Sequence, residues 1–189
     1  NCFAISEAFD GAGSKAHTVF GVILGTGVGA GIVIGKKIHK GKNKIAGEWG
    51  HNPLPWANEG ELPGKKCYCG RTGCLETFIS GPAIEREFKN LHGKNLDMKN
   101  IVKESGAGNL KAEQTIRNFE DRLARALAHV INILDPDSIV LGGGLSNIDR
   151  LYSNVPKIWA EYIFSDDVST VLSKARFGDS SGVRGAAWL

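Results

Sequence analysis

The amino-acid sequence predicts an α/β fold, a sheet covered by helices, on three observations. Two short apolar runs rich in β-branched residues, at 18–24 and 138–141, are typical of buried strands. The stretch 110–134 repeats its apolar residues at steps of three and four, which predicts a long amphipathic helix. A cluster of glycines follows each strand, where the chain must turn. Strands and helices that alternate along one chain indicate a layered α/β architecture.

The first part of the chain is expected to form a helix and a hairpin. Residues 1–9 carry apolar side chains at helical spacing, and two glycines soon afterwards end the helix. A strand over 18–24 is then joined to a second strand over 32–34 by the glycine-rich turn 25–31. This region is therefore predicted to be a helix followed by two paired strands.

The elements after residue 80 are expected to be mostly helical. Ser80 is expected to cap a helix that has Pro82 in its first turn and Ile84, Phe88 and Leu91 along one face. The further elements are expected in this order: a short helix near Ile101, the long helix 110–134, the strand 138–141, a helix over 151–164, an edge strand within 168–177, a turn at 178–182 and a final helix over 183–189.

Composition and charge argue against several classes of protein. The chain carries 23 basic and 20 acidic side chains, a net charge of +3, which argues against a nucleic-acid partner. The densest basic run, 36–44, is broken by a glycine and an apolar residue and indicates an exposed turn. No apolar run is long enough for a membrane span, and we expect no signal peptide. The cysteines are expected to be reduced and to bind a metal, which predicts a cytoplasmic protein.

Three of the four cysteines, Cys67, Cys69 and Cys74, fall close together with glycines that allow a tight loop. Thiolates and a neutral imidazole suit tetrahedral Zn²⁺, so His51 is the natural fourth ligand of a closed structural site. Disulfides or plain reduced thiols are the alternatives. A chain with 42% hydrophobic residues can bury a core without disulfides, which favours zinc. Cys2 is expected to be a buried small apolar side chain.

Two carboxylates stand beside these candidate ligands. Glu48 lies three residues before His51, and Glu76 lies two residues after Cys74. Either acid alone is most simply explained as a solvated surface side chain. A metal that fixes the loop would also fix both acids, and rigid carboxylates are good acceptors for the hydroxyl groups of a polyol. The pair therefore predicts a sugar site.

Two glycine clusters are candidates for contacts with phosphate or nucleotide. The segment 25–31 could be a hairpin with bulges, but its glycines would let backbone N–H groups approach phosphate oxygens, and Thr26 adds a hydroxyl donor. It lacks the Lys-Ser/Thr ending of a P-loop. Gly142, Gly143 and Gly144 follow a strand, where bare backbone lets a flat or anionic ligand lie close. An ordinary strand-to-helix turn explains one glycine more easily than three.

Two segments carry a more specific pattern. They read Glu48-Trp49-Gly50-His51 and Cys67-Tyr68-Cys69-Gly70-Arg71-Thr72-Gly73-Cys74-Leu75-Glu76. Together they resemble the signature of the ROK family, which comprises bacterial sugar kinases with related repressors and open reading frames. The resemblance assigns zinc binding to His51, Cys67, Cys69 and Cys74, and sugar contacts to Glu48, His51 and Glu76.

The resemblance covers essentially the whole chain and implies its fold. Residues 1–189 would form the larger, C-terminal lobe of an actin-like, ribonuclease-H-like ATPase, with a zinc-binding loop at 47–81. Asn1 resembles the last residue of the family's Asn-Asp-Ala-Asn motif, whose Asp is the catalytic base. The base is therefore expected just before Asn1, and the N-terminal lobe with its first phosphate motif is also expected outside this chain.

The resemblance also implies how a nucleotide is held. Gly25, Thr26 and Gly27 would form the second phosphate loop of the actin-like superfamily, and the glycine triplet 142–144 would contact the adenosine of ATP. The implied activity is phosphorylation of a hexose by ATP with Mg²⁺. Hexose, ATP and a second copy of the chain are the expected partners, and residues 1–189 alone are expected to be inactive.

The substrate and its alternatives follow from the same segments. Residues 48–56 and 76–81 look most like bacterial fructokinases that also accept mannose. N-acetylglucosamine kinases of the same family are the alternative substrate class. A sugar-responsive transcriptional repressor of the family is the rival without catalysis, and a zinc-stapled binding module is a third, which would leave both glycine clusters unexplained.

Overall fold

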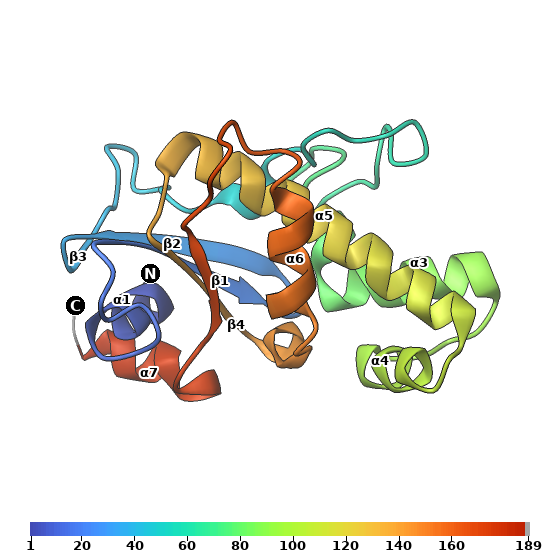
Figure 1. The fold of residues 1–189 in the computed structure, drawn as a ribbon. Helices are drawn as coiled ribbons and strands as arrows, with labels where there is room; N and C mark the ends of the chain where they lie inside the picture. The colour runs from blue at the N-terminus through green and yellow to red at the C-terminus, as the bar shows by residue number, and fades with distance from the viewer. Residues whose placement is uncertain (188–189) are drawn as a thin grey trace.

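A five-stranded mixed sheet organises the computed structural model, which describes residues 1–187, with Asp179 described by its backbone alone. The strands are β1 (Thr18–Leu24), β2 (Val28–Ile34), β3 (Lys37–Ile38), β4 (Ser138–Gly142) and β5 (Val171–Lys174). Their order across the sheet is β3-β2-β1-β4-β5, in which β1 pairs antiparallel with β2 and parallel with β4, and β4 pairs parallel with β5. The carboxyl ends of β1 and β4 therefore meet at one edge of the sheet (Figure 1).

Helices cover both faces of this sheet. The helices are α1 (Cys2–Phe9), α2 (Glu76–Ile79), α3 (Gly81–His92), α4 (Met98–Gly106), α5 (Leu110–Leu134), α6 (Leu151–Trp159) and α7 (Ser181–Ala186). Figure 1 shows α1 and α7 side by side on one face and α5 and α6 on the other, with α3 and α4 beside the far part of α5. No helix within residues 1–187 has the length and apolar character needed to cross a bilayer.

The alternation of β1 explains why the strand is buried on both faces. Phe20, Val22 and Leu24 belong to the large core beneath α5 and α6, whereas Val19 belongs to a smaller core with α1. Side chains along a strand point to opposite faces in turn, so an apolar run of this kind needs a helix on each face. The predicted strands 18–24 and 138–141, and the predicted helix 110–134, are confirmed.

Helix α1 lies unusually close to the sheet because glycines face it. A Cβ atom at Gly21 would lie 2.7 Å from the Cβ of Ala4, and one at Gly142 would lie 2.4 Å from the ring of Phe3. The position of α1 over β1 and β4 therefore depends on two residues without side chains. Its N-terminal end lies over β2, because a Cβ atom at Gly31 would lie 3.1 Å from the Cα of Asn1.

A buried carboxylate joins α1 to the segment before α7. Glu7 is fully buried and accepts hydrogen bonds from the backbone N–H groups of Ala12 at 2.9 Å and Arg176 at 3.0 Å. The hydroxyl group of Ser181 donates to its other oxygen at 2.6 Å. A buried charge needs several donors of this kind, so Glu7 holds the two terminal segments together.

Two predicted boundaries are wrong. The second strand begins at Val28 rather than at residue 32, because Leu24 pairs with Val28 and only three residues form the turn. Helix α6 ends at Trp159 rather than at Phe164. The side chain of Asn132 accepts a hydrogen bond from the Phe164 N–H at 2.9 Å and donates to the Tyr162 carbonyl at 2.8 Å, which holds the last residues in an irregular turn.

Smaller corrections concern helix ends and faces. Ser80 precedes α3 as expected, but its side chain makes no capping hydrogen bond. Leu91 is 62% exposed and does not join the apolar face of α3. The expected turn at 178–182 is a short 3₁₀ helix (Gly178–Ser180) followed directly by α7, which starts two residues before the predicted helix 183–189. Residues 188 and 189 of that prediction lie outside the described residues.

Candidate functional site

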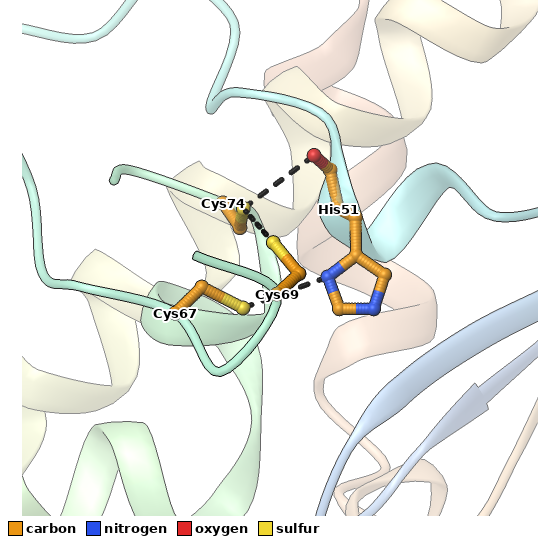
Figure 2. A group of neighbouring side chains, drawn as sticks. All are labelled: His51, Cys67, Cys69 and Cys74. Atoms are coloured by element: carbon orange, nitrogen blue, oxygen red, sulfur yellow. Dashed lines mark hydrogen bonds between the residues drawn. The ribbon is translucent and has the colours of Figure 1, made fainter. Parts of the chain in front are cut away.

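Four side chains converge on one point beside the sheet. One ring nitrogen of His51 and the Sγ atoms of Cys67, Cys69 and Cys74 all lie within 4.8 Å of one another. The His51 Nδ1 to Cys67 Sγ distance is 3.5 Å, and the Cys69 Sγ to Cys74 Sγ distance is 3.6 Å. Figure 2 shows the three thiols and one ring nitrogen of His51 facing the same space. The predicted ligand set is therefore brought together.

Local backbone contacts place these ligands. A 3₁₀ helix, η1 (Trp49–His51), carries the histidine, and Trp49 packs its ring edge-on against Phe20 of the core. The segment after η1 runs beside the last cysteine, since Leu75 N–H donates to the Asn52 carbonyl at 2.8 Å. The first cysteines lie on a tight turn in which Cys67 N–H donates to the Arg71 carbonyl at 2.8 Å. These two backbone hydrogen bonds thus hold the segments that carry the four candidate ligands.

The distances fit a tetrahedral zinc site and exclude a disulfide between Cys69 and Cys74. Tetrahedral bonds of about 2.3 Å to sulfur and about 2.0 Å to nitrogen separate two sulfurs by about 3.8 Å and a sulfur from a nitrogen by about 3.5 Å. All four cysteines are free, and 3.6 Å between Cys69 and Cys74 is well beyond an S–S bond of about 2.05 Å. Burial, followed by the neighbouring thiols of Cys69 and Cys67, raises the pKa of Cys74 to about 12. A divalent cation would remove that cost of ionisation.

The two predicted sugar carboxylates differ in how they are held. Glu76, the first residue of α2, accepts a hydrogen bond from the Val28 N–H at 3.1 Å, and its other oxygen lies 3.8 Å from Cys67 Sγ. Glu48 is exposed at the start of η1. Both act on Tyr68, whose pKa is raised by desolvation and then by the charges of Glu76, Cys67 and Glu48. Glu76 therefore contacts the cluster directly, whereas Glu48 is related to it through its effect on Tyr68.

Tyr68 is a site residue that the sequence analysis missed. Its hydroxyl group lies 3.0 Å from Nε2 of His51, and the two rings meet edge to face with centroids 5.1 Å apart. The signal was present in the sequence, because a residue between two candidate metal ligands would stay close to any metal that they bind. The aromatic side chain between Cys67 and Cys69 could have been singled out on that ground.

A cleft of about 720 Å³ opens at the carboxyl edge of β1 and β4. On the sheet side it is lined by Gly25 and Thr26 of the hairpin and by Gly144 after β4. On the other side it is lined by residues from α3 and α4, among them Glu85, Met98, Lys99 and Val102. Its size suits a drug-sized ligand. The α3 and α4 wall was missed, since a helix predicted from its buried face gives no sign of what its other face meets.

The three glycines at 142–144 have different surroundings: two lie in packed positions and one lines the cleft. Gly142 faces Phe3, and a Cβ atom at Gly143, which has φ of +80°, would lie 2.4 Å from the Leu24 carbonyl oxygen. Gly144 has open space at its Cβ position and lines the cleft. Packing thus accounts for two of the three glycines, and their contact with a nucleotide stays a prediction.

A second hollow of about 480 Å³ adjoins the hairpin. Its lining includes Thr26 and Gly27 from the hairpin and Cys67, Tyr68 and Glu76 from the zinc loop. A Cβ atom at residue 27 would lie 2.8 Å from the Glu76 carboxylate, so a larger residue there would push that side chain aside. The hollow therefore joins the glycine hairpin to the zinc loop.

A buried ion-pair network that the sequence analysis also missed holds the loop between η1 and α2. Glu61 is 7% exposed and receives hydrogen bonds from Arg122 and Arg125 of α5, each with a closest distance of 2.8 Å. Arg125 also donates to the carbonyl of Trp56 at 2.9 Å. Burial alone would raise the pKa of Glu61, but the bonds from Arg125 and Arg122 outweigh it and hold the pKa at about 2. The loop is thus fixed to α5.

A mixed sheet with helices on both faces, a glycine hairpin and a His-Cys₃ cluster beside it together define a recognised class of protein. The chain belongs to the ROK family, whose sequence profile matches residues 1–189. It is 39% identical over 193 residues to an N-acetyl-D-glucosamine kinase of Yersinia enterocolitica and 40% identical to one of Photobacterium profundum. Each match covers 100% of this chain, which spans 64% of the length of these relatives.

Solved structures extend the likeness to the fold. A ROK hexokinase from Thermus thermophilus superimposes with a TM-score of 0.87 at 29% identity over 99% of this chain and 61% of the hexokinase. A ROK glucokinase from Streptomyces griseus, in complex with glucose and AMPPNP, superimposes with a TM-score of 0.85 at 27% identity. The match covers 99% of this chain and 64% of the glucokinase. A ROK transcriptional regulator, a homologue of the E. coli MLC protein, superimposes with a TM-score of 0.83 at 26% identity. The match covers 98% of this chain and 48% of the regulator. The fold is therefore that of ROK kinases and regulators alike.

Proposed function

We propose that the protein containing this chain transfers the terminal phosphoryl group of ATP to a hexose. The observation that carries the proposal is that two cavities meet at the glycine hairpin. Thr26 and Pro82 line both the 720 Å³ cleft and the 480 Å³ hollow. A nucleotide in the cleft and a sugar in the hollow would present their reacting ends to each other at Thr26. Positioning of this kind is most of what phosphoryl transfer requires of a protein.

The nucleotide would lie with its phosphates at the hairpin. Gly25, Thr26 and Gly27 offer backbone N–H groups and one hydroxyl group to phosphate oxygens, with Mg²⁺ neutralising their charge. The wall of α3 and α4 supplies apolar side chains from Met98 and Val102 for a flat base. Gly144 leaves the opposite wall open for the same group.

The sugar would be held by the acids beside the metal cluster. Glu48 and Glu76 would accept hydrogen bonds from sugar hydroxyl groups, and His51 would donate one from its outer ring nitrogen. A zinc ion bound by His51 and the three cysteines would act as a structural brace, because all four positions are filled by protein. The zinc loop therefore serves the sugar site by keeping its polar groups in place.

Two hexoses are candidates for the substrate. The name of the curated relatives, which are 39–40% identical to this chain, supports N-acetylglucosamine. The residues of segments 48–56 and 76–81 favour fructose, which the names of these relatives do not support. The comparisons thus favour the alternative over the substrate first expected. A cytoplasmic location and a homodimer remain predictions of the same proposal.

ADP release by the full-length, zinc-containing protein tests the proposal. ATP and Mg²⁺ are supplied with N-acetylglucosamine, fructose, mannose or glucose in parallel, and a preparation of residues 1–189 serves as the inactive comparison. We expect strong release with at least one sugar by the full-length protein alone. No release with any sugar would overturn the proposal and favour a sugar-responsive regulator, whose DNA binding would then be measured with each sugar.

A further inference from the structure

The hydroxyl group of Tyr68 contacts Nε2 of His51, the ring nitrogen that would bind a sugar hydroxyl group. Tyr68 is 83% exposed, so little packing holds its ring. Its placement rests on the 3.0 Å contact between its hydroxyl group and Nε2 of His51 and on the edge-to-face meeting of the two rings. An exposed aromatic side chain held by one hydrogen bond can exchange that bond for another at low cost.

The backbone around Tyr68 is much more constrained than its side chain. Cys67 and Cys69, on either side, both belong to the metal cluster. The turn is closed by backbone hydrogen bonds from Cys67 to Arg71 at 2.8 Å and from Gly70 to Cys67 at 3.0 Å. Rotation of its own side chain is therefore the simplest way for Tyr68 to leave His51, while its backbone stays at the hollow that the residue lines.

The outer nitrogen of His51 has one hydrogen to give. Its Nδ1 atom faces Cys67 Sγ at 3.5 Å, so a metal bound at Nδ1 would leave the hydrogen of the neutral ring on Nε2. That hydrogen would point to the oxygen of Tyr68, which lies 3.0 Å from Nε2. A sugar hydroxyl group that bonds to the same hydrogen must therefore displace Tyr68.

The displaced ring would remain beside the bound sugar. Tyr68 lines the same 480 Å³ hollow as Glu76 and Thr26. A hydroxyl substituent next to the displaced ring needs little room, whereas an acetamido group has nearly the bulk of the ring's outer half. The two would compete for the part of the hollow that Tyr68 lines.

We propose that Tyr68 is a specificity-determining residue: it occupies His51 in the free site and, once displaced, favours hexoses with a hydroxyl group over those with an acetamido group beside His51. The inference rests on the proposed function, because it assumes that the hollow binds a sugar. It adds a residue that selects among hexoses, and it predicts that the substrate need not follow that of the 40% identical relatives.

Two substitutions in the full-length, zinc-loaded protein test the inference. Tyr68→Phe removes the competing oxygen, and we expect the dissociation constants of glucose and mannose to fall roughly threefold or more. Tyr68→Ala also removes the ring, and we expect the preference for N-acetylglucosamine over glucose, and for N-acetylmannosamine over mannose, to rise about tenfold. Phe164→Ala, which truncates a fully exposed aromatic side chain outside both cavities, should change neither quantity.

Dissociation constants measured by calorimetry without ATP separate this inference from the proposed function. If the wild-type protein binds sugars but releases no ADP, the kinase proposal fails while the binding ratios still decide the role of Tyr68. Ratios that stay within twofold in Tyr68→Ala, at unchanged zinc content, would overturn the inference. Unchanged affinities in Tyr68→Phe would do the same, and absence of sugar binding by the wild-type protein would overturn both proposals.

Discussion

The carboxylate of Glu76 accepts a hydrogen bond from the backbone N–H of Val28 over 3.1 Å, which ties the zinc loop directly to the glycine hairpin. Its other oxygen lies 3.8 Å from Cys67 Sγ. One side chain therefore touches the hairpin, the metal cluster and the hollow between them. A group placed in this way can position a sugar relative to a phosphate with little freedom on either side.

Replacing Glu76 with Gln should weaken sugar binding and leave the fold intact. The amide oxygen can still accept the Val28 N–H, but the charged acceptor for sugar hydroxyl groups is lost. We expect the sugar dissociation constant of the full-length protein, measured by calorimetry, to rise about tenfold or more. Glu59→Gln, at an exposed carboxylate of the same loop, is the matched control. Unaltered affinity in Glu76→Gln would count against its role.

Replacing Cys69 with Ala should remove zinc and loosen the loop. The site needs all four ligands to be closed, and metal binding contributes directly to the stability of such loops. Metal analysis should find about one zinc per wild-type chain and far less in the variant, with a lower melting temperature. Cys2→Ala removes a cysteine that lies outside the cluster and should retain the metal. Full zinc content in Cys69→Ala would disprove the assignment.

The ion pairs of Glu61 should make stability depend on pH at the acid end. Its pKa in the folded chain is about 2 against a usual 4.5, so its contribution is complete above pH 4.5 and is lost as the pH falls toward 2. The shift corresponds to at most about 3 kcal/mol. Urea unfolding of the wild-type protein and Glu61→Gln should differ most near pH 6, and the difference should shrink steadily below pH 4.5 and vanish only toward pH 2. A constant difference would contradict this origin, and zinc content is checked at each pH.

Local patterns predicted the parts of this molecule whose causes are local. The strand 18–24 and the helix 110–134 follow from apolar periodicity, and the cysteine spacing predicted the cluster that the structure brings together. Glu61 could not be linked to Arg122, because 61 residues separate them and neither lies in a motif. The role of Gly142 could not be predicted either, because the glycine makes room for the ring of Phe3, which lies on a helix at the other end of the chain.

The glycine at position 21 should be essential for the close approach of α1 to the sheet. An added Cβ would lie 2.7 Å from the Cβ and 2.8 Å from the Cα of Ala4, so the helix backbone would have to shift. We expect Gly21→Ala to lower the free energy of unfolding by about 2 kcal/mol, as overpacking of a core commonly does. Gly29→Ala is the matched control in the same sheet, because nothing lies within 4 Å of its Cβ position. Its effect should stay within about 0.5 kcal/mol in urea unfolding. Equal losses in the two variants would show that β propensity or hairpin geometry, and not contact with α1, accounts for the glycine.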